Sequence, residues 1–244
     1  MRSARFLLSA AAIFALLCQI ARSGDVLTQR NDNLRTGWTQ APGWNSQTTQ
    51  QLHPRNSLSV AGNVYAQPLY VKSLNRVFIA TAKNFVYAFD ASTGSQAWSR
   101  QLAPNDASLI LSPTEGCNTM WLDDSQSGHN GIGINGTPVI DLAGQSLLVS
   151  YRTNTSASPA DAKQMLVALD LNSGNVKAGP VGVAPPGAAT DWLPWHANRL
   201  ALLLSGGVVY VGFGSRCEGE SNPKYKRYNG WLLAYDARTL QPSI

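Results

Sequence analysis

The chain has 244 residues, of which 44% are hydrophobic and 14% are charged. This length allows one large domain or two small ones around a sizeable apolar core. The 21 Gly, 13 Pro, 7 Trp and 8 Tyr favour many short strands, and without a glycine period or heptads the composition excludes collagen, a coiled coil and wholesale disorder.

The first element is predicted to be an export signal over residues 1–23. Two arginines precede an apolar run over 6–17, and small residues before Gly24 suit cleavage by a signal peptidase. The run is shorter than the roughly 20 residues that span a membrane. A lipid anchor at Cys18 is disfavoured by the bulky residue before it. We therefore expect a secreted or periplasmic chain with no membrane span.

Removal of this segment leaves 16 basic and 14 acidic residues. The nearly balanced chain has no Lys/Arg run to neutralise phosphates, so we expect no binding to nucleic acid. Two cysteines remain, Cys117 and Cys217, which can form a disulfide in an oxidising compartment; two free thiols are the alternative. Neither belongs to a CxxC pair and the histidines are scattered, so no zinc signature is present.

A sequence repeat organises the rest of the chain. Three segments, at 85–98, 165–174 and 232–239, each combine an apolar strand with an Ala-x-Asp corner and a tight turn. The Asp side chain can accept N–H bonds across the turn, and Gly94 and Gly174 can adopt a positive φ.

Each repeat is predicted to form a unit of antiparallel strands. The expected strands are 65–71, 76–80, 85–90 and 95–102 in the first unit, 137–140, 146–151, 165–170 and 175–183 in the second, and 200–204, 208–213 and 232–236 in the third. The last strand of the third unit is expected to be missing.

The corner of the first unit carries a family resemblance. Ala88, Asp90, Gly94 and Trp98 match in full the Ala-x-Asp-x-x-x-Gly-x-x-x-Trp motif of the pyrroloquinoline quinone (PQQ) repeat. The chain resembles the quinoprotein alcohol dehydrogenase-like β-propellers, in which the Trp docks between neighbouring blades. The resemblance implies an all-β fold, a partial β-propeller of four-stranded antiparallel blades with about three blades visible.

The other two copies of the motif are less complete. The second keeps Ala168, Asp170 and Gly174, and the third keeps Ala234 and Asp236. Ala178 stands where the second copy would have Trp, and Leu240 where the third would have Gly. These departures are interpreted as decay of the motif.

The predicted domains are the signal over 1–23, an N-terminal segment over 24–60 and an incomplete propeller over 61–244. Propellers close with about four to eight blades, so the chain is expected to be part of a ring, as a truncated product or a fragment. In the resembled family a strand near the N-terminus completes the final blade. Val26–Gln29 would be that strand here, and it is expected to lack its partner.

Strand order sorts the loops between two rims. The turns between first and second strands, and between third and fourth strands, emerge on a short-turn rim. The long loops, at 103–136, 152–163, 184–198 and 214–229, emerge on the opposite, long-loop rim. Because loops on a rigid scaffold often carry function, the long-loop rim is predicted to bind the partner, a protein or a glycan.

This rim also holds the candidate cofactor residues. Trp192, Trp195, His196 and Arg199 could stack on and orient a planar ligand, and Asp123 and Asp124 could supply oxygens to calcium. The structural alternative is that the tryptophans cover blade edges and the acids are solvated. Both cysteines map to the same rim, where a disulfide would join adjacent loops.

Three functions are consistent with these residues. The favoured one is a non-catalytic exported scaffold or binding module, because the docking motif packs blades whether or not a quinone binds. The alternative, implied by the resemblance, is a fragment of a PQQ- and calcium-dependent alcohol or sugar dehydrogenase. A hydrolase or lyase using His129 or His196 has no supporting Ser/His/Asp or paired-carboxylate pattern.

Overall fold

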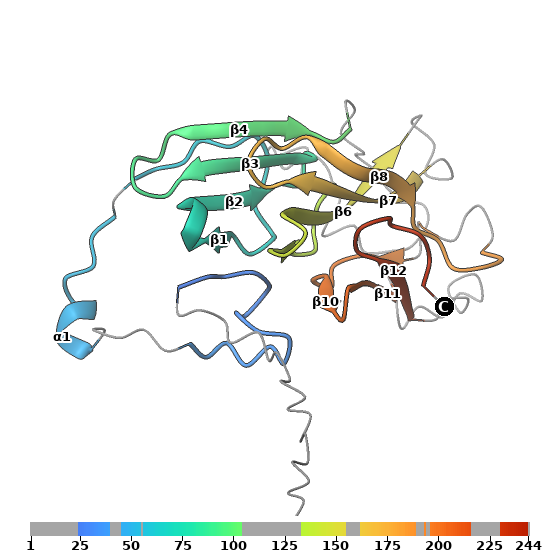
Figure 1. Ribbon diagram of the computed structural model, residues 1–244, viewed down its shortest axis with the longest axis horizontal. Coiled ribbons are helices and arrows are strands. Elements are labelled where there is room, and N and C mark those ends of the chain that lie inside the picture. The colour runs from blue at the N-terminus through green and yellow to red at the C-terminus, as the bar shows by residue number, and fades with distance from the viewer. Residues whose placement is uncertain are drawn as a thin grey trace, which may run out of the picture.

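The computed structural model describes residues 24–39, 45–54, 56–103, 133–154, 162–188, 193, 196–215 and 230–243. This part of the chain is almost entirely β, with one short helix, α1 (Ser46–Thr49), and one 3-10 turn, η1 (Lys72–Leu74). No helix within it has the length and apolar character needed to cross a membrane. Three four-stranded antiparallel sheets form an open arc, which confirms the predicted partial propeller (Figure 1).

The sheets follow one another along the chain. The first contains β1 (Leu69–Val71), β2 (Arg76–Ala80), β3 (Phe85–Asp90) and β4 (Gln96–Gln101). The second contains β5 (Val139–Asp141), β6 (Ser146–Asn154), β7 (Ala162–Asp170) and β8 (Val176–Gly182). The third contains β10 (Leu203–Ser205), β11 (Val208–Ser215), β12 (Trp231–Asp236) and β9 (His196–Ala197), which pairs with the end of β11.

Several strands differ in length from the expectation. The first strand of the first sheet begins at Leu69 rather than at residue 65, and the hairpin of β6 and β7 pairs as far as Asn154 and Ala162. The expected loop over 152–163 is therefore partly strand. The sequence pattern missed this extension because polar residues interrupt the apolar alternation after Tyr151.

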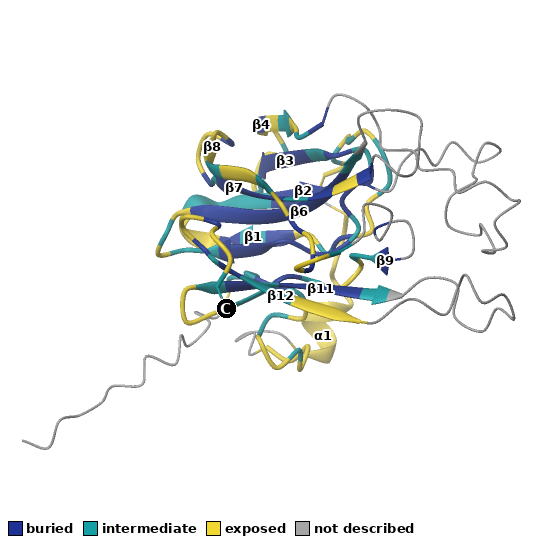
Figure 2. Ribbon diagram, turned by 90° about the vertical axis from the view of Figure 1, so that its right-hand side faces the viewer, coloured by how far each residue is buried: buried dark blue, intermediate teal, exposed yellow. Residues whose placement is uncertain are grey.

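Side chains that alternate along each strand fill the two spaces between sheets. In β6, Leu147 and Val149 face the first sheet in one buried cluster, whereas Leu148 faces the third sheet in another. Val167 and Leu166 of β7 divide in the same way. The second sheet is thus apolar on both faces, and the middle strands are largely buried while α1 is exposed (Figure 2).

Beyond β12 the third sheet also has the beginning of an outer strand, which corresponds to the last strand of the unit that was expected to be missing. Pro242 forms an antiparallel bridge with Tyr235, and the Ser243 N–H donates to the carbonyl oxygen of Ala234 over 2.8 Å. The expectation was wrong because Leu240, at the Gly position of the motif, has a positive φ. This conformation turns the chain back alongside β12.

The segment over 25–37 contacts all three sheets, whereas the expected ring-closing role of Val26–Gln29 in a final blade stays a prediction. Val26 pairs with Tyr70 of β1, and the Ile140 N–H of β5 donates to the carbonyl oxygen of Leu27 over 2.9 Å. This N-terminal brace then reaches the third sheet, where Asn33 and Arg35 donate to backbone carbonyls (Figure 1). It therefore contacts the innermost strands of the first two sheets and the edge of the third.

Candidate functional site

The three corner turns at the short-turn rim have the same hydrogen bonds. Oδ1 of Asp90, Asp170 and Asp236 accepts the N–H groups two and three residues ahead, over 2.8–3.1 Å. These bonds favour the ionised form and hold the pKa of all three carboxyls below the ordinary value, with the Ser92 hydroxyl as the largest cause at Asp90. The corner carboxylates therefore already bind N–H groups of their own turns.

Trp98 fills the junction between the first and second sheets. Its ring atoms lie 2.6–3.0 Å from the place where a Cβ on Gly174 would be, and its Nε1 donates to the carbonyl oxygen of Leu171 over 3.1 Å. Trp98 is 9% exposed and also contacts Phe78, with ring centroids 5.9 Å apart. Because a Cβ on Gly174 would collide with the indole, this corner requires glycine for space as well as for its φ of 69°.

The junction between the second and third sheets uses the reverse arrangement. Ala178 pairs with Ala168 as Trp98 pairs with Ala88, so it occupies the position of the docking Trp. Leu240 occupies the glycine position with φ of 57°, is fully buried, and its Cδ1 lies 2.9 Å from the place of a Cβ on Gly179. The interpretation of these departures as decay was therefore incomplete. In the second junction the large side chain lies at the corner and the small one on the outer strand, the reverse of the first junction.

Polar side chains link the sheets near the long-loop rim. Nε2 of Gln164 donates to Ser150 Oγ over 2.8 Å and to Asn198 Oδ1 over 3.2 Å, and Asn198 Nδ2 donates to the Gly212 carbonyl over 2.8 Å. Asn84 of the β2–β3 turn donates to the Arg152 carbonyl over 2.8 Å. This rim network connects all three sheets through side chains that are mostly buried.

Within the part of the chain that the structure describes, some buried oxygens beside this network lack a hydrogen-bond partner. They are Thr81 Oγ1, Asn84 Oδ1 and Asn135 Oδ1. The three residues lie together, because Ile134 donates to the Thr81 carbonyl and a Cβ on Gly133 would lie 2.1 Å from Asn84 Oδ1. An unpaired buried acceptor costs about 1–3 kcal/mol, so such oxygens are suited to receive a donor.

The structure describes two of the predicted cofactor residues. His196 lies in β9 and is 3% exposed, whereas Arg199 is exposed, and both take part in interactions within the chain. Their role in binding a planar ligand stays a prediction. The other predicted residues, Trp192, Trp195, Asp123, Asp124, Cys117 and Cys217, lie outside the described residues.

Sequence reasoning missed the rim network. Arg152 and Gln164 face each other in the β6–β7 register, two pairs beyond Ser150 and Leu166. Continuing the strand alternation past residue 151 would have placed both on the face toward the third sheet. Asn84 had a weaker signal in the sequence, as a polar residue in a short turn. The structure gives it a φ of 61°, a conformation in which Asn is enriched.

Comparison with known proteins gives the family. A family model described as outer membrane protein assembly factor BamB matches residues 55–215, which is more than half of the chain. The chain belongs to this family. Its PQQ-type repeats account for the three sheets and their corner turns, as the resemblance implied.

The solved structures that match the chain include two dehydrogenases and a BamB. A europium-containing methanol dehydrogenase aligns with a TM-score of 0.62 and 16% identity, over 90% of this chain and 31% of that chain. The quinohemoprotein alcohol dehydrogenase from Comamonas testosteroni gives 0.47 and 15%, over 93% and 41%. BamB from Moraxella catarrhalis gives 0.42 and 15%, over 77% and 41%. The chain thus spans less than half of each, and no curated protein matches it.

Proposed function

We propose that the chain is an exported PQQ-type propeller module that binds another protein through its long-loop rim and has no catalytic role of its own. The observation that carries the proposal is the contrast between the rims. At the short-turn rim the corner carboxylates bond within their own turns. At the opposite rim a polar network links the three sheets, and the side-chain oxygens of Thr81 and Asn84 have no hydrogen-bond partner.

Two further observations support export and a protein ligand. Residues 1–23 have the pattern of a secretion signal. The description of the matching family model names an assembly factor of outer membrane proteins, and this favours protein over glycan as the ligand. A glycan remains the second ligand class to test at the same rim.

The second candidate function is a fragment of a PQQ- and calcium-dependent dehydrogenase. Among the described residues no group of three or more His, Cys, Asp or Glu side chains could hold a metal ion, and the predicted Asp123 and Asp124 lie outside them. We therefore derive no step through calcium or a quinone. The likeness to the methanol dehydrogenase concerns the fold alone.

The test compares the two rims in the purified full chain. Lys83→Glu changes the charge of the β2–β3 turn at the long-loop rim, and Arg238→Glu is the matched change in a corner turn at the other rim. Binding is measured on arrays of extended peptides and of glycans, and a parallel titration with PQQ and Ca²⁺ follows the quinone spectrum and dye reduction with alcohols. We expect peptide binding that Lys83→Glu weakens at least tenfold and Arg238→Glu leaves unchanged.

Each other result overturns a part of the proposal. Binding of glycans but not peptides would replace the protein ligand. Equal loss in both variants, or no binding on either array, would refute the long-loop rim as the binding surface. A bound quinone with alcohol-dependent dye reduction would establish the dehydrogenase instead.

A further inference from the structure

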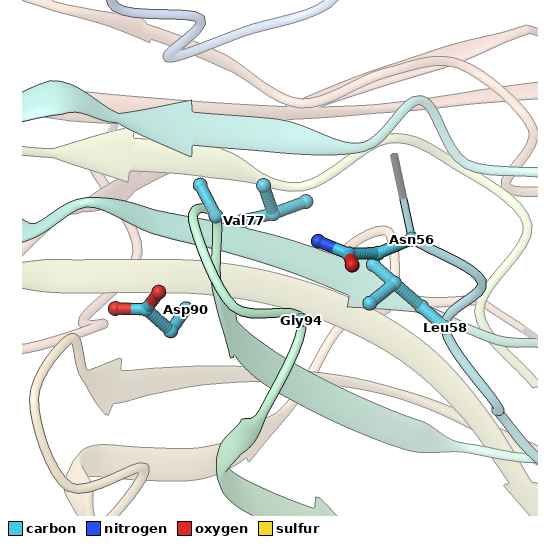
Figure 3. Close-up of a pocket in the computed structure, with 6 residues that line it drawn as sticks. Asn56, Leu58, Val77, Asp90 and Gly94 are labelled. Carbon is cyan, nitrogen blue, oxygen red and sulfur yellow. The ribbon is translucent and has the colours of Figure 1, made fainter. Parts of the chain in front are cut away.

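Three buried side-chain oxygens lie where the β2–β3 turn meets the segment before β5, and in the described part of the chain they have no hydrogen-bond partner. They are Thr81 Oγ1 and Asn84 Oδ1 of the turn and Asn135 Oδ1 of the segment. Thr81 and Asn84 are 0% exposed, so bulk solvent does not hydrate their side chains. The hollow at the first corner, at the opposite rim, differs because Asn56 already lies over Gly94 there (Figure 3).

The N–H groups around these oxygens are already used. Those of Ala82, Asn84, Gly133 and Ile134 all donate to backbone carbonyl oxygens, over 2.7–3.4 Å. Asn84 Nδ2 donates to the Arg152 carbonyl over 2.8 Å, which fixes the direction of Asn84 Oδ1. A Cβ on Gly133 would lie 2.1 Å from this oxygen, so it faces the backbone of the segment before β5. The turn and the segment therefore meet through acceptors whose neighbouring donors are committed elsewhere.

Two cationic side chains of the same region are held at other places. The stem of Lys83 lies against Gly62, with its Cβ and Cγ 2.7–2.9 Å from the place of a Cβ there. The Arg152 side chain alternates with Leu148 along β6 and so faces the third sheet, where its Nη2 donates to the Leu193 carbonyl over 3.2 Å. These contacts keep both side chains engaged away from the three oxygens.

We propose that the three oxygens bind a dehydrated monovalent metal cation, potassium or sodium. A water molecule donates two hydrogen bonds and so leaves one of three acceptors unpaired, whereas a cation attracts all of them at once. None of the three oxygens belongs to a carboxylate that would balance a second positive charge, and neutral oxygens can replace the hydration shell of a monovalent ion. The bound ion would join the first sheet to the second inside the long-loop rim. This inference does not depend on which ligand the rim binds.

The test measures urea unfolding of the purified full chain while KCl or NaCl replaces tetramethylammonium chloride at constant ionic strength. Tetramethylammonium is too large for the site. We expect the urea midpoint to rise with K⁺ or Na⁺ and then to saturate, as for a ligand that binds only the folded state. Amide hydrogen exchange gives a local measurement, and the N–H groups of Asn84 and Gly133 should exchange at least tenfold more slowly at saturation.

Two results of this titration would overturn the proposal. No response to either ion would show that the oxygens are hydrated by water only. A response to CaCl₂ at the same ionic strength, without one to K⁺ or Na⁺, would assign the site to a divalent ion instead.

A pair of threonine variants locates the ion. Thr81→Val removes one oxygen with little change of shape, so it should weaken the apparent affinity for the ion at least tenfold. Without the ion it should be as stable as the parent or more stable, because it deletes an unpaired buried hydroxyl. Thr137→Val is the matched control, since Thr137 is also buried but its hydroxyl accepts the Gln67 N–H over 3.0 Å.

The control should lower the urea midpoint equally in all salts and keep the rise with K⁺ or Na⁺. Equal ion responses in Thr81→Val and Thr137→Val would place the ion elsewhere and overturn the assignment.

Discussion

The exchange of large and small side chains between Ala178 and Leu240 predicts a strong coupling between these positions. In the first junction the outer strand supplies Trp98 and the corner supplies Gly174; in the second the outer strand supplies Ala178 and the corner Leu240. The perturbation is to convert the second junction into the first, with Ala178→Trp, Leu240→Gly and the double variant.

The structure sets the expected magnitudes. Removing a fully buried leucine side chain costs about 2–5 kcal/mol, and glycine at a left-handed position recovers about 1–2 kcal/mol, so Leu240→Gly should destabilise the chain by roughly 2 kcal/mol. Ala178→Trp forces an indole against the Leu240 side chain and should cost roughly 3 kcal/mol. In the double variant the ring occupies the space that leucine leaves. Its cost should be roughly 1–2 kcal/mol, which gives a coupling of about 3 kcal/mol.

Urea unfolding followed by far-ultraviolet circular dichroism measures all four proteins without interference from the added indole. Lys177→Trp is the matched control, since it adds the same ring at an exposed position of β8 and should change stability by less than about 1 kcal/mol. If the double variant loses the sum of the two single losses, positions 178 and 240 do not share one space, and the reasoning is refuted.

Three further predictions concern the other structural devices. Trp98→Ala should destabilise the chain by about 3–5 kcal/mol in the same urea assay, and Trp98→Phe by clearly less, because it loses mainly the bond to the Leu171 carbonyl; equal losses would contradict the packing role. The corner carboxyls have folded-state pKa values below the ordinary 3.8, so their stabilisation is present above that pH and is lost as the pH falls below it. Asp90→Asn should therefore flatten the acid decline of the urea midpoint between pH 5 and 2, and an unchanged decline would refute this. Arg35→Gln should cost roughly 2 kcal/mol and speed proteolysis of the N-terminal brace, because it removes charged bonds to Thr28, Gln29 and Leu202; unaltered proteolysis would show that the bonds do not hold the brace.

The repeating elements of the fold could be predicted from the sequence because their causes are local. An apolar strand followed by Asp and a positive-φ residue determines a corner turn with little help from the rest of the chain, and the observed corners at Asp90 and Asp170 agree with that. The strand interiors alternate in side-chain direction, which is also a local property.

Contacts between distant segments could not be predicted in this way. Leu240 looked like a departure from the motif, and its role depends on the absence of a ring at Ala178, in another sheet. The partners of Val26 depend on the arrangement of three sheets and have no short-range signal. The rim network was missed for a similar reason, because Gln164 and Asn198 meet only across a sheet junction.

The candidate site stays a prediction, both for the rim and for its residues. Loop lengths nominated the long-loop rim, and the described polar network lies there. His196 was chosen for its residue type, but strand pairing with β11 buries it, which a sequence pattern of two residues cannot reveal.

The N-terminal brace has a consequence for how the chain acquires its structure. Within each sheet, strands that follow one another in sequence pair as hairpins. In contrast, the hydrogen bonds from Asn33 to Leu204 and from Arg35 to Leu202 join positions 171 and 167 residues apart. Contacts of such long sequence separation require closure of a large loop and form slowly. The contacts of the brace with the third sheet can therefore form only after that sheet has been synthesised, and they add a direct link across all three sheets to the apolar packing between neighbouring sheets.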